Sequence, residues 1–385
     1  MKIITTTDSL HKFCNKAQKA PYVVLDTEFM RECTFFSQLC LIQIATPNDE
    51  AIIDPLAKGI DLKALVKILM NKDIVKVLHA ARQDMEIFYN LCSAVPAPIF
   101  DSQIAAMALG FGGSVSYMAL VKGRLGINLD KGARFTNWAK RPLTEKQLNY
   151  ALGDVTHLRD IYPGLVKDLD NKNHRVMVDE EMQTLMDENL YTFNPERAWM
   201  RLKPRNLKLE YLAVLKVSAA WREQEAIKKN VPRNRIIKDD GIYDIALRQP
   251  TSLKELGVLR GVPNGFENRR GVNRLIKAIK TVQTNAKIYA PKIRAPKHMP
   301  SNLAPAVDML KTLLRLKAEY QNIASRMVAT TKELEQIAAF KDKADVKALK
   351  GWRKELFGED ALAMLEGKLS LSFKDGKVIA VRTAS

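Results

Sequence analysis

The first 110 residues alternate between short apolar, β-rich runs and stretches whose apolar residues recur at helical spacing. This alternation predicts strands over residues 22–29, 39–46, 50–54 and 74–79. It predicts helices over residues 61–70 and 82–91. The Pro47-Asn48-Asp49 turn joins two of the strands, whereas the later ones are separated by helices. We therefore expect an α/β domain built on a mixed sheet with flanking helices.

Beyond this region the pattern is mainly helical and is interrupted by two proline-marked breaks. Further helices are predicted over 102–109, 115–125 and 145–161. The breaks lie between residues 194 and 204 and between 290 and 305. We expect three domains, an α/β domain at 1–195 and two all-α helical domains at 204–287 and 303–385. The polar stretch 369–380 is compatible with either a frayed end or a small hairpin.

The positive charge of the chain is concentrated in its middle. Lys and Arg outnumber Asp and Glu by 61 to 43, which gives a net charge of +18. Residues 201–300 hold 23 basic and 8 acidic side chains, a net of +15, whereas residues 1–200 hold 23 and 24. Basic surfaces attract polyanions through phosphate charge and counterion release. The helical domain at 204–287 is thus expected to bind nucleic acid; a basic surface kept for solubility is the alternative.

Several classes of protein are disfavoured by features that the sequence lacks. The N-terminus is too polar for a signal peptide, and no apolar stretch approaches the ~20 residues that span a bilayer. No GxxxxGK[ST] motif occurs, so a nucleotide cofactor is not expected. The four cysteines form no CxxC pair and have no zinc-ligand spacing. A cytoplasmic protein without a membrane segment is the expectation.

Asp26 and Glu28 are two residues apart at the end of a predicted strand that begins with apolar residues. Side chains at this spacing share one face of a strand. Two carboxylates beside a core are costly unless a cation lies between them, and Mg²⁺ or Mn²⁺ is the natural partner for such ligands. The alternative for the pair alone is two solvated carboxylates at a strand end.

Three further residues complete a candidate constellation. Asp84 lies in the first turn of the helix that follows the strand at 74–79, and strand ends in α/β sheets gather functional residues at one edge. Tyr150 and Asp154 are four apart on a predicted helix and therefore share a face. Taken singly, Asp84 could only complement the helix dipole, and Asp154 could be exposed beside a half-buried Tyr150.

The combination resembles the DEDD exonuclease superfamily. Asp26-x-Glu28, HAARQDMEIF with Asp84, and Tyr150-x-x-x-Asp154 follow in its order and spacing, and the tyrosine is typical of the DEDDy branch. The segments VVLDTEFMRE, LCLIQIA, FDSQIAA, NWAKRPL and YALGDVTHL are similar to those of the ribonuclease D family, over about residues 20–165. Residues 205–285 resemble the HRDC domain, and 305–385 a second, divergent copy. Ala139 departs from the pattern, where a small polar residue is expected after Trp138.

The resemblance implies an RNase H-like fold and 3′-to-5′ hydrolysis of RNA to nucleoside 5′-monophosphates, assisted by two divalent metal ions (Mg²⁺ or Mn²⁺). It implies that Asp26 bridges the two ions, that Glu28 and Asp154 complete the first site, and that Asp84 holds the second. Tyr150 has an ordinary pKa near 10, so orienting the attacking water suits it better than acting as a base.

Contacts to the substrate are also predicted, and three of them have a structural alternative. Phe29 and Met30 could pack on the terminal base, although Phe29 could equally belong to the core. His79 could bind the terminal sugar or be satisfied within the protein. Trp138 and Arg141 could border the groove for the strand, although Trp138 could equally pack between helices.

RNA is the expected partner, with precursor tRNA 3′ ends implied by the family resemblance, and the chain is expected to act as a monomer. One rival function is a DNA exonuclease with the same core, because the carboxylates cannot distinguish ribose from deoxyribose. A nucleic-acid-binding scaffold with an inactive nuclease fold is a rival of another class. The complete set of four carboxylates speaks against the scaffold.

Overall fold

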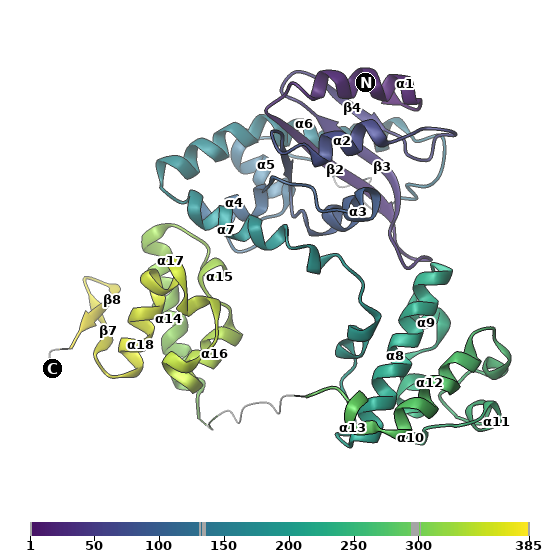
Figure 1. The fold of residues 1–385 in the computed structure, drawn as a ribbon. Helices are drawn as coiled ribbons and strands as arrows, with labels where there is room; N and C mark the ends of the chain where they lie inside the picture. Colours follow the sequence, from purple (N-terminus) through teal and green to yellow (C-terminus); the bar gives the residue numbers. More distant parts are fainter. Residues whose placement is uncertain (1, 131, 133–135, 294–299, 301, 384–385) are drawn as a thin grey trace. The chain divides into compact units, whose positions relative to one another are not determined.

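The computed structural model describes residues 2–130, 132, 136–293, 300 and 302–383. The chain divides into two compact units (Figure 1). The first comprises Met1–Glu28, Leu41–Leu190 and Pro296–Ser385, and the second comprises Phe29–Cys40 and Tyr191–Ala295. Each unit combines segments that are far apart in the sequence.

A six-stranded mixed sheet forms the framework of the first unit. Its strands, in the order β1-β4-β3-β2-β5-β6, are β1 (Ile3–Ile4), β4 (Glu50–Ile53), β3 (Gln38–Ala45), β2 (Tyr22–Met30), β5 (Val75–Leu78) and β6 (Ile99–Asp101). β3 and β4 are antiparallel, as the predicted hairpin requires, while β2, β5 and β6 run parallel. β1 and β6 were not predicted, because two and three residues are too few to show a period.

Seven helices accompany this sheet in the described residues. They are α1 (Thr7–Ala17), α2 (Lys63–Met70), α3 (Arg82–Cys92), α4 (Ser102–Ala108), α5 (Tyr117–Leu125), α6 (Glu145–Asn171) and α7 (Arg175–Leu185). α6 begins at a capping box formed by Thr144 and Gln147. It continues past Pro163, where the sequence predicts an end, because buried residues such as Leu165 and Leu169 anchor the second half in the core. Burial here outweighs the cost of an interior proline.

The second unit is helical and has its own core. Its helices are α8 (Leu209–Lys229), α9 (Arg233–Ile236), α10 (Asp239–Arg248), α11 (Leu253–Gly257), α12 (Val272–Thr284) and α13 (Ala286–Tyr289). The loop between β2 and β3 belongs to this unit. Phe35 is buried in its core, and the backbone N–H groups of Phe35 and Phe36 both donate to Asn230 Oδ1 at 3.1 Å. A segment encoded inside the α/β region therefore completes the helical unit.

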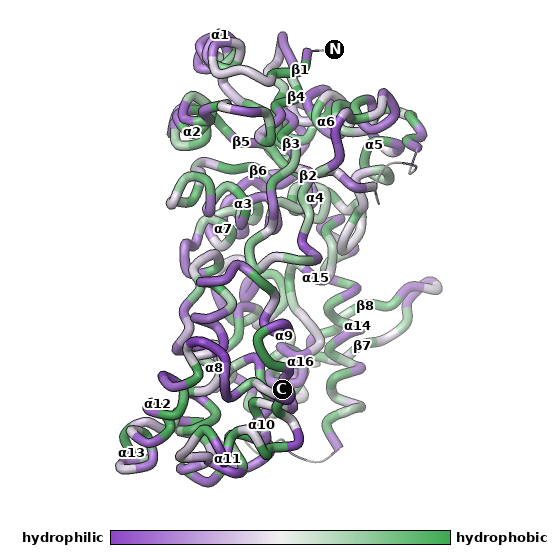
Figure 2. The backbone as a smooth tube through the Cα atoms, turned by 90° about the vertical axis from the view of Figure 1, so that its right-hand side faces the viewer, coloured by the Kyte–Doolittle hydropathy of each residue, from purple (hydrophilic) through white to green (hydrophobic). Residues whose placement is uncertain are grey.

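The C-terminal region of the first unit is helical and ends in a hairpin. It contains α14 (Ala304–Gln321), α15 (Ser325–Val328), α16 (Thr331–Phe340), α17 (Gly351–Arg353), α18 (Glu359–Leu365), β7 (Leu369–Lys374) and β8 (Lys377–Arg382). Apolar and polar residues alternate along α14 (Figure 2), and its buried side is part of a separate core. The hairpin β7–β8 settles the alternative left open for residues 369–380.

Candidate active site

The central strand β2 positions the first two carboxylates. Its apolar start, Val23 to Leu25, is fully buried, and the chain then emerges so that Asp26 and Glu28 are partly exposed on either side of the buried Thr27. β2 runs parallel to β5, so both strands end at the same edge of the sheet. The predicted sharing of one face by Asp26 and Glu28 follows from the period of the strand.

Helix α6 brings Asp154 to this edge. One face of α6 is anchored in the core by Ala151, Val155 and Leu158. One carboxylate oxygen from each of Asp26, Glu28 and Asp154 can be chosen so that all three lie within 4.8 Å of one another. Residues separated by more than 120 positions in the sequence thus form one anionic cluster, as predicted.

Helix α3 holds Asp84 through a contact that the sequence did not predict. The Thr27 hydroxyl donates a 2.5 Å hydrogen bond to Asp84 Oδ1, and both side chains are buried. Thr27 therefore connects the strand that carries Asp26 and Glu28 to the helix that carries Asp84. A small hydroxyl residue between two acids was the only sequence signal for this role.

The negative charges of the clustered carboxylates repel one another. Burial and, to a smaller extent, the nearby charge of Asp84 together raise the pKa of Asp154 to about 7. Burial likewise raises the pKa of Asp84 to about 6, although the hydrogen bond from Thr27 opposes this effect. The pKa of Asp26 is raised well above its ordinary value by burial and by the charges of Asp84, Asp154 and Glu28. Crowded oxygen ligands that resist ionisation in this way fit a site for hard divalent cations.

Two further residues shape the site and were also missed. The Tyr117 hydroxyl donates to the backbone carbonyl of Gly153 at 2.8 Å, next to Asp154. Burial and the charges of Asp154 and Asp26 raise the pKa of Tyr117, which keeps its hydroxyl protonated. Asp101 accepts from the backbone N–H groups of Ala80 and Ala81 and so fixes the turn that leads into α3. Neither contact involves residues close in sequence.

Tyr150 is half-buried on α6, one turn before Asp154. Its ring lies 6.1 Å from that of Trp138, centroid to centroid. Trp138 is only 2% exposed, which supports the packing alternative for this residue. The tryptophan ring thus packs beside the ring of Tyr150.

His79 and Arg141 have protein partners that account for their positions. His79 Nδ1 lies 2.9 Å from the Ser102 hydroxyl, and its Nε2 lies 3.2 Å from the carbonyl of Val115. The Arg141 guanidinium makes a bidentate ion pair with Asp54, with N···O distances of 2.6 and 2.7 Å. The contacts of His79 support its structural alternative, and substrate binding by either residue stays a prediction.

Phe29 and Met30 end β2 and are both partly exposed. They follow Glu28 directly, so they lie at the same end of the strand as the carboxylates. Their predicted packing against a terminal base also stays a prediction.

Comparisons with known proteins give the family. Residues 1–170 match the 3′-5′ exonuclease family, and residues 212–279 match the HRDC domain. Ribonuclease D of Nitrobacter hamburgensis is 46% identical over 381 residues, which cover 99% of each chain. The chain belongs to the ribonuclease D family.

Ribonuclease D of Bartonella henselae is 42% identical over 98% of this chain and 93% of that one. The crystal structure of Escherichia coli RNase D, "an exoribonuclease involved in structured RNA processing", matches with a TM-score of 0.81 at 30% identity, covering 95% and 98%.

These findings confirm the predicted family, the fold class and the activity. This member of the family is a 3′-to-5′ exoribonuclease with an α/β exonuclease domain and an HRDC domain. RNA is its substrate class, and enzymes of its exonuclease family use divalent metal ions. The described helices include none that is long and apolar enough to cross a membrane. The identity of residues 303–385 as a second HRDC copy stays a prediction.

Proposed function

We propose that this ribonuclease D trims the 3′ ends of precursor tRNA and other small structured RNA with two divalent ions, Mg²⁺ or Mn²⁺. The observation that carries the metal site is the cluster of Asp26, Glu28 and Asp154, with oxygens within 4.8 Å of one another. Asp84 extends this cluster through the electrostatic coupling that it shares with Asp26 and Asp154. Action as a monomer in the cytoplasm is part of the same proposal.

The four carboxylates differ in the roles that their surroundings suit. The charges of Glu28, Asp84 and Asp154 all act on Asp26, so Asp26 would contribute an oxygen to the binding of both ions. Glu28 and Asp154 complete the first site with it. Asp84, whose Oδ1 is held by Thr27, is placed to hold the second. When bound, such ions lower the pKa of a coordinated water and stabilise charge on the phosphoryl group and the leaving oxygen.

Tyr150 orients the attacking water by a hydrogen bond, assisted by Glu28. The Tyr150→Phe variant is expected to lower kcat by about 10- to 100-fold, because a misplaced reactant costs roughly this much. Mn²⁺ affinity, measured by calorimetry, should stay close to that of the wild type. Tyr162→Phe is the matched control, since Tyr162 lies on the same helix and packs against Tyr22 and Phe100. An unchanged kcat in Tyr150→Phe would remove the orienting role.

The decisive test of the proposed function is the release of mononucleotides from tRNA with a 3′ extension. With Mg²⁺ or Mn²⁺ we expect nucleoside 5′-monophosphates and a product that ends near the mature 3′ end. A chelator should stop the release. Internal cleavage fragments, or release that continues in chelator, would contradict the proposal. Parallel digestion of matched RNA and DNA oligonucleotides tests the preference for RNA.

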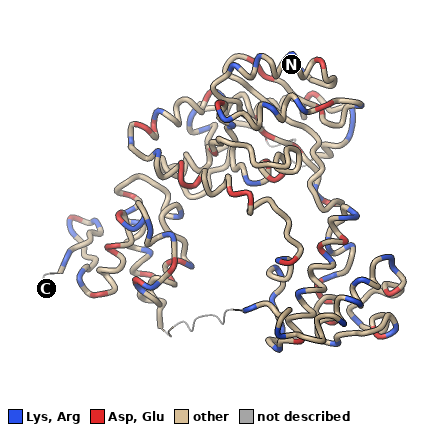
Figure 3. Tube along the Cα trace, in the orientation of Figure 1, with Lys and Arg blue, Asp and Glu red and all other residues tan. Residues whose placement is uncertain are grey.

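The second unit supplies exposed positive charge for RNA binding (Figure 3), although part of its charge is used internally. Arg222 pairs with Asp239 at 2.7 Å, Arg233 with the buried Glu223 at 2.5 Å, and Arg274 with the buried Glu225. Other exposed cations, such as Arg205 and Lys229, are paired with Asp240 and Glu225. In contrast, Arg235, Lys238, Arg260 and Arg270 are exposed and make no hydrogen bond or ion pair through their side chains within the described residues. These four are the better candidates for phosphate contacts.

Replacing Lys238 and Arg270 together by alanine should weaken the binding of structured RNA and lower its salt dependence. Each lost phosphate contact reduces the slope of log K against log salt by about 1. The exposed Lys72 of the first unit provides the control variant Lys72→Ala. An unchanged slope in the double variant would exclude these residues as phosphate contacts. Deleting residues 204–385 is a poorer test, because it also removes partners of the buried Phe35 and of α7.

A further inference from the structure

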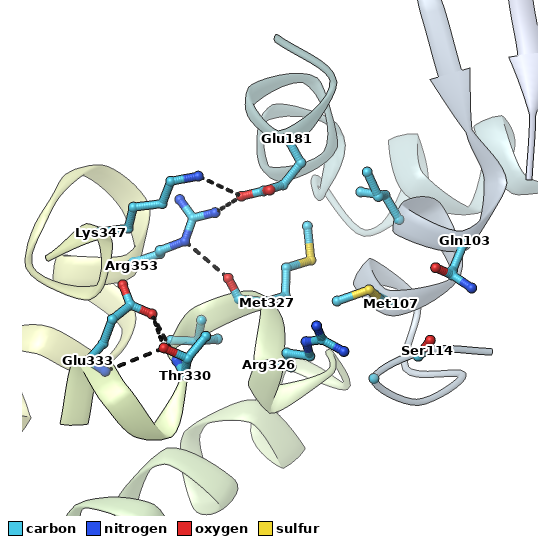
Figure 4. A pocket seen from close by; sticks show the side chains of 13 residues that line it. Gln103, Met107, Ser114, Glu181, Arg326, Met327, Thr330, Glu333, Lys347 and Arg353 are labelled. Atoms are coloured by element: carbon cyan, nitrogen blue, oxygen red, sulfur yellow. Dashed lines mark hydrogen bonds and ion pairs between the residues drawn. The ribbon is translucent and has the colours of Figure 1, made fainter. Parts of the chain in front are cut away.

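The C-terminal region packs against the exonuclease domain within the first unit and leaves a cavity of about 400 Å³ at the joint (Figure 4). Its walls come from α4, the loop after α4, α7 and the segment from α15 to α17. A cavity of this size accommodates a small organic ligand such as a nucleotide. The carboxylate cluster is not part of its lining.

The joint is fixed by contacts that preform the cavity. Arg353 is 2% exposed; it donates to Glu180 at 2.6 Å, to the carbonyl of Met327 at 3.0 Å, and to Glu181. The backbone N–H of Ala324 donates to the carbonyl of Met107 at 2.8 Å. A buried charge with three partners and a direct backbone bond hold both walls in place. The cavity is therefore preformed, and a preformed site lowers the entropy cost of ligand binding.

The lining of the cavity combines an apolar surface with polar groups. Met107 and Met327 approach from the two sides of the joint, and Ile104 and Val328 extend the apolar surface. Methionine sulfur makes favourable contacts with aromatic rings, which suits a planar base. Gln103 and Ser114 add an amide and a hydroxyl to the lining.

The charges of the lining favour an anion. Its two acids are engaged, because Glu181 accepts from Arg353 and lies 3.9 Å from Lys347, while Glu333 accepts from the Thr330 N–H and hydroxyl at 2.9 Å. Arg326 is exposed and makes no hydrogen bond or ion pair through its side chain with the part of the chain that is described. A guanidinium without a partner is well suited to a phosphate.

We propose that this cavity binds a nucleotide, with the base on the methionine surface and the phosphate at Arg326. The nucleotide can belong to the RNA chain or be a released nucleoside monophosphate, since the enzyme acts on the first and produces the second. The loop after α4 connects the cavity to the active site. Ser114 lines the cavity, the carbonyl of Val115 accepts from Gln103 Nε2 at 2.9 Å, and Tyr117 bonds to Gly153 beside Asp154.

The test is calorimetric titration of the full chain with adenosine 5′-monophosphate, both with Mg²⁺ and with EDTA. Binding at the cavity should persist in EDTA, where binding at the carboxylates is suppressed. Arg326→Ala should raise Kd about tenfold, equivalent to about 1.4 kcal/mol. Arg315→Ala, an exposed arginine of α14 outside the cavity, should leave Kd unchanged. Ser114→Trp, which fills the cavity without removing charge, should abolish binding.

Competition by a short oligoadenylate distinguishes the two sources of the ligand. Displacement of the mononucleotide indicates a site for a nucleotide of the RNA chain, and no displacement indicates a site for the released product; both outcomes support the proposal. The absence of binding in EDTA, or equal Kd values for Arg326→Ala and Arg315→Ala, would overturn it. Hydrolysis by the wild type is measured separately, so failure of this inference leaves the proposed metal site untouched.

Discussion

The Asp26→Asn variant is expected to lose hydrolysis almost completely while it still binds RNA. The charges of Glu28, Asp84 and Asp154 all raise the pKa of Asp26, so the four carboxylates influence one another. On the proposed two-ion mechanism, replacing one oxygen of Asp26 by an amide removes a ligand that both ions would use. Metal catalysis contributes several kcal/mol, so we expect kcat to fall by about 10³-fold or more. Single-turnover release of mononucleotides measures the loss, and filter binding measures the affinity for RNA.

The control for this experiment is a carboxylate that lies outside the cluster but on an element of the site. Asp170 is exposed near the end of α6, the helix that carries Asp154. Asp170→Asn changes the net charge by the same amount as Asp26→Asn, so a general electrostatic effect on RNA binding would appear in both variants. Near-normal turnover in Asp26→Asn would rule out the metal mechanism.

The grouping of Asp26, Glu28 and Asp154 could be predicted because its signals are local. Asp26 and Glu28 show the period of a strand, and Tyr150 and Asp154 show that of a helix. The order of these motifs along the chain added the specificity that each lacked. The contact between Thr27 and Asp84 could not be predicted in the same way, because it joins residues 57 positions apart.

Other features could not be predicted because the sequence does not show which distant residues pack together. Arg141 has the chemistry to bind phosphate, but its pairing with Asp54, 87 positions away, is visible only in the fold. The loop that contains Phe35 lies between two strands of the sheet in sequence, yet its side chain completes the core of the helical unit. Pro163 predicts a helix end, whereas tertiary burial continues α6 beyond it. In each case a contact between distant segments outweighs the local preference.

The second large effect expected concerns the free energy of unfolding. It should depend on pH in the metal-free protein, and metal binding should reverse the order of stability of the wild type and an Asp154 variant. In the metal-free protein the pKa of Asp154 is raised to about 7 and that of Asp84 to about 6, chiefly by burial. The folded state therefore holds protons that the unfolded state has already lost. Stability from these groups is present at low pH and falls as pH rises from about 4, the ordinary value for Asp, to about 7.

Asp154→Asn isolates this contribution, because an amide cannot ionise. In EDTA at pH 8 the variant should be more stable than the wild type by about 4 kcal/mol, since the pKa of Asp154 is raised from about 4 to about 7 and each tenfold change in proton affinity corresponds to about 1.4 kcal/mol. The difference should shrink toward pH 5, where the wild-type carboxyl is protonated. Urea unfolding at pH 5, 6.5 and 8 measures it, with Asp170→Asn as the control.

Saturating Mg²⁺ or Mn²⁺ should reverse the order of stability at pH 8. The wild type gains free energy from ions that bind only its folded state, whereas the variant has lost a ligand and gains less. A difference in EDTA that is constant from pH 5 to 8 would show that Asp154 is not held in its neutral form by the fold. The absence of reversal by metal would separate the buried acids from any role as ligands. The same carboxylates thus destabilise the empty site and, on this proposal, provide the affinity that fills it.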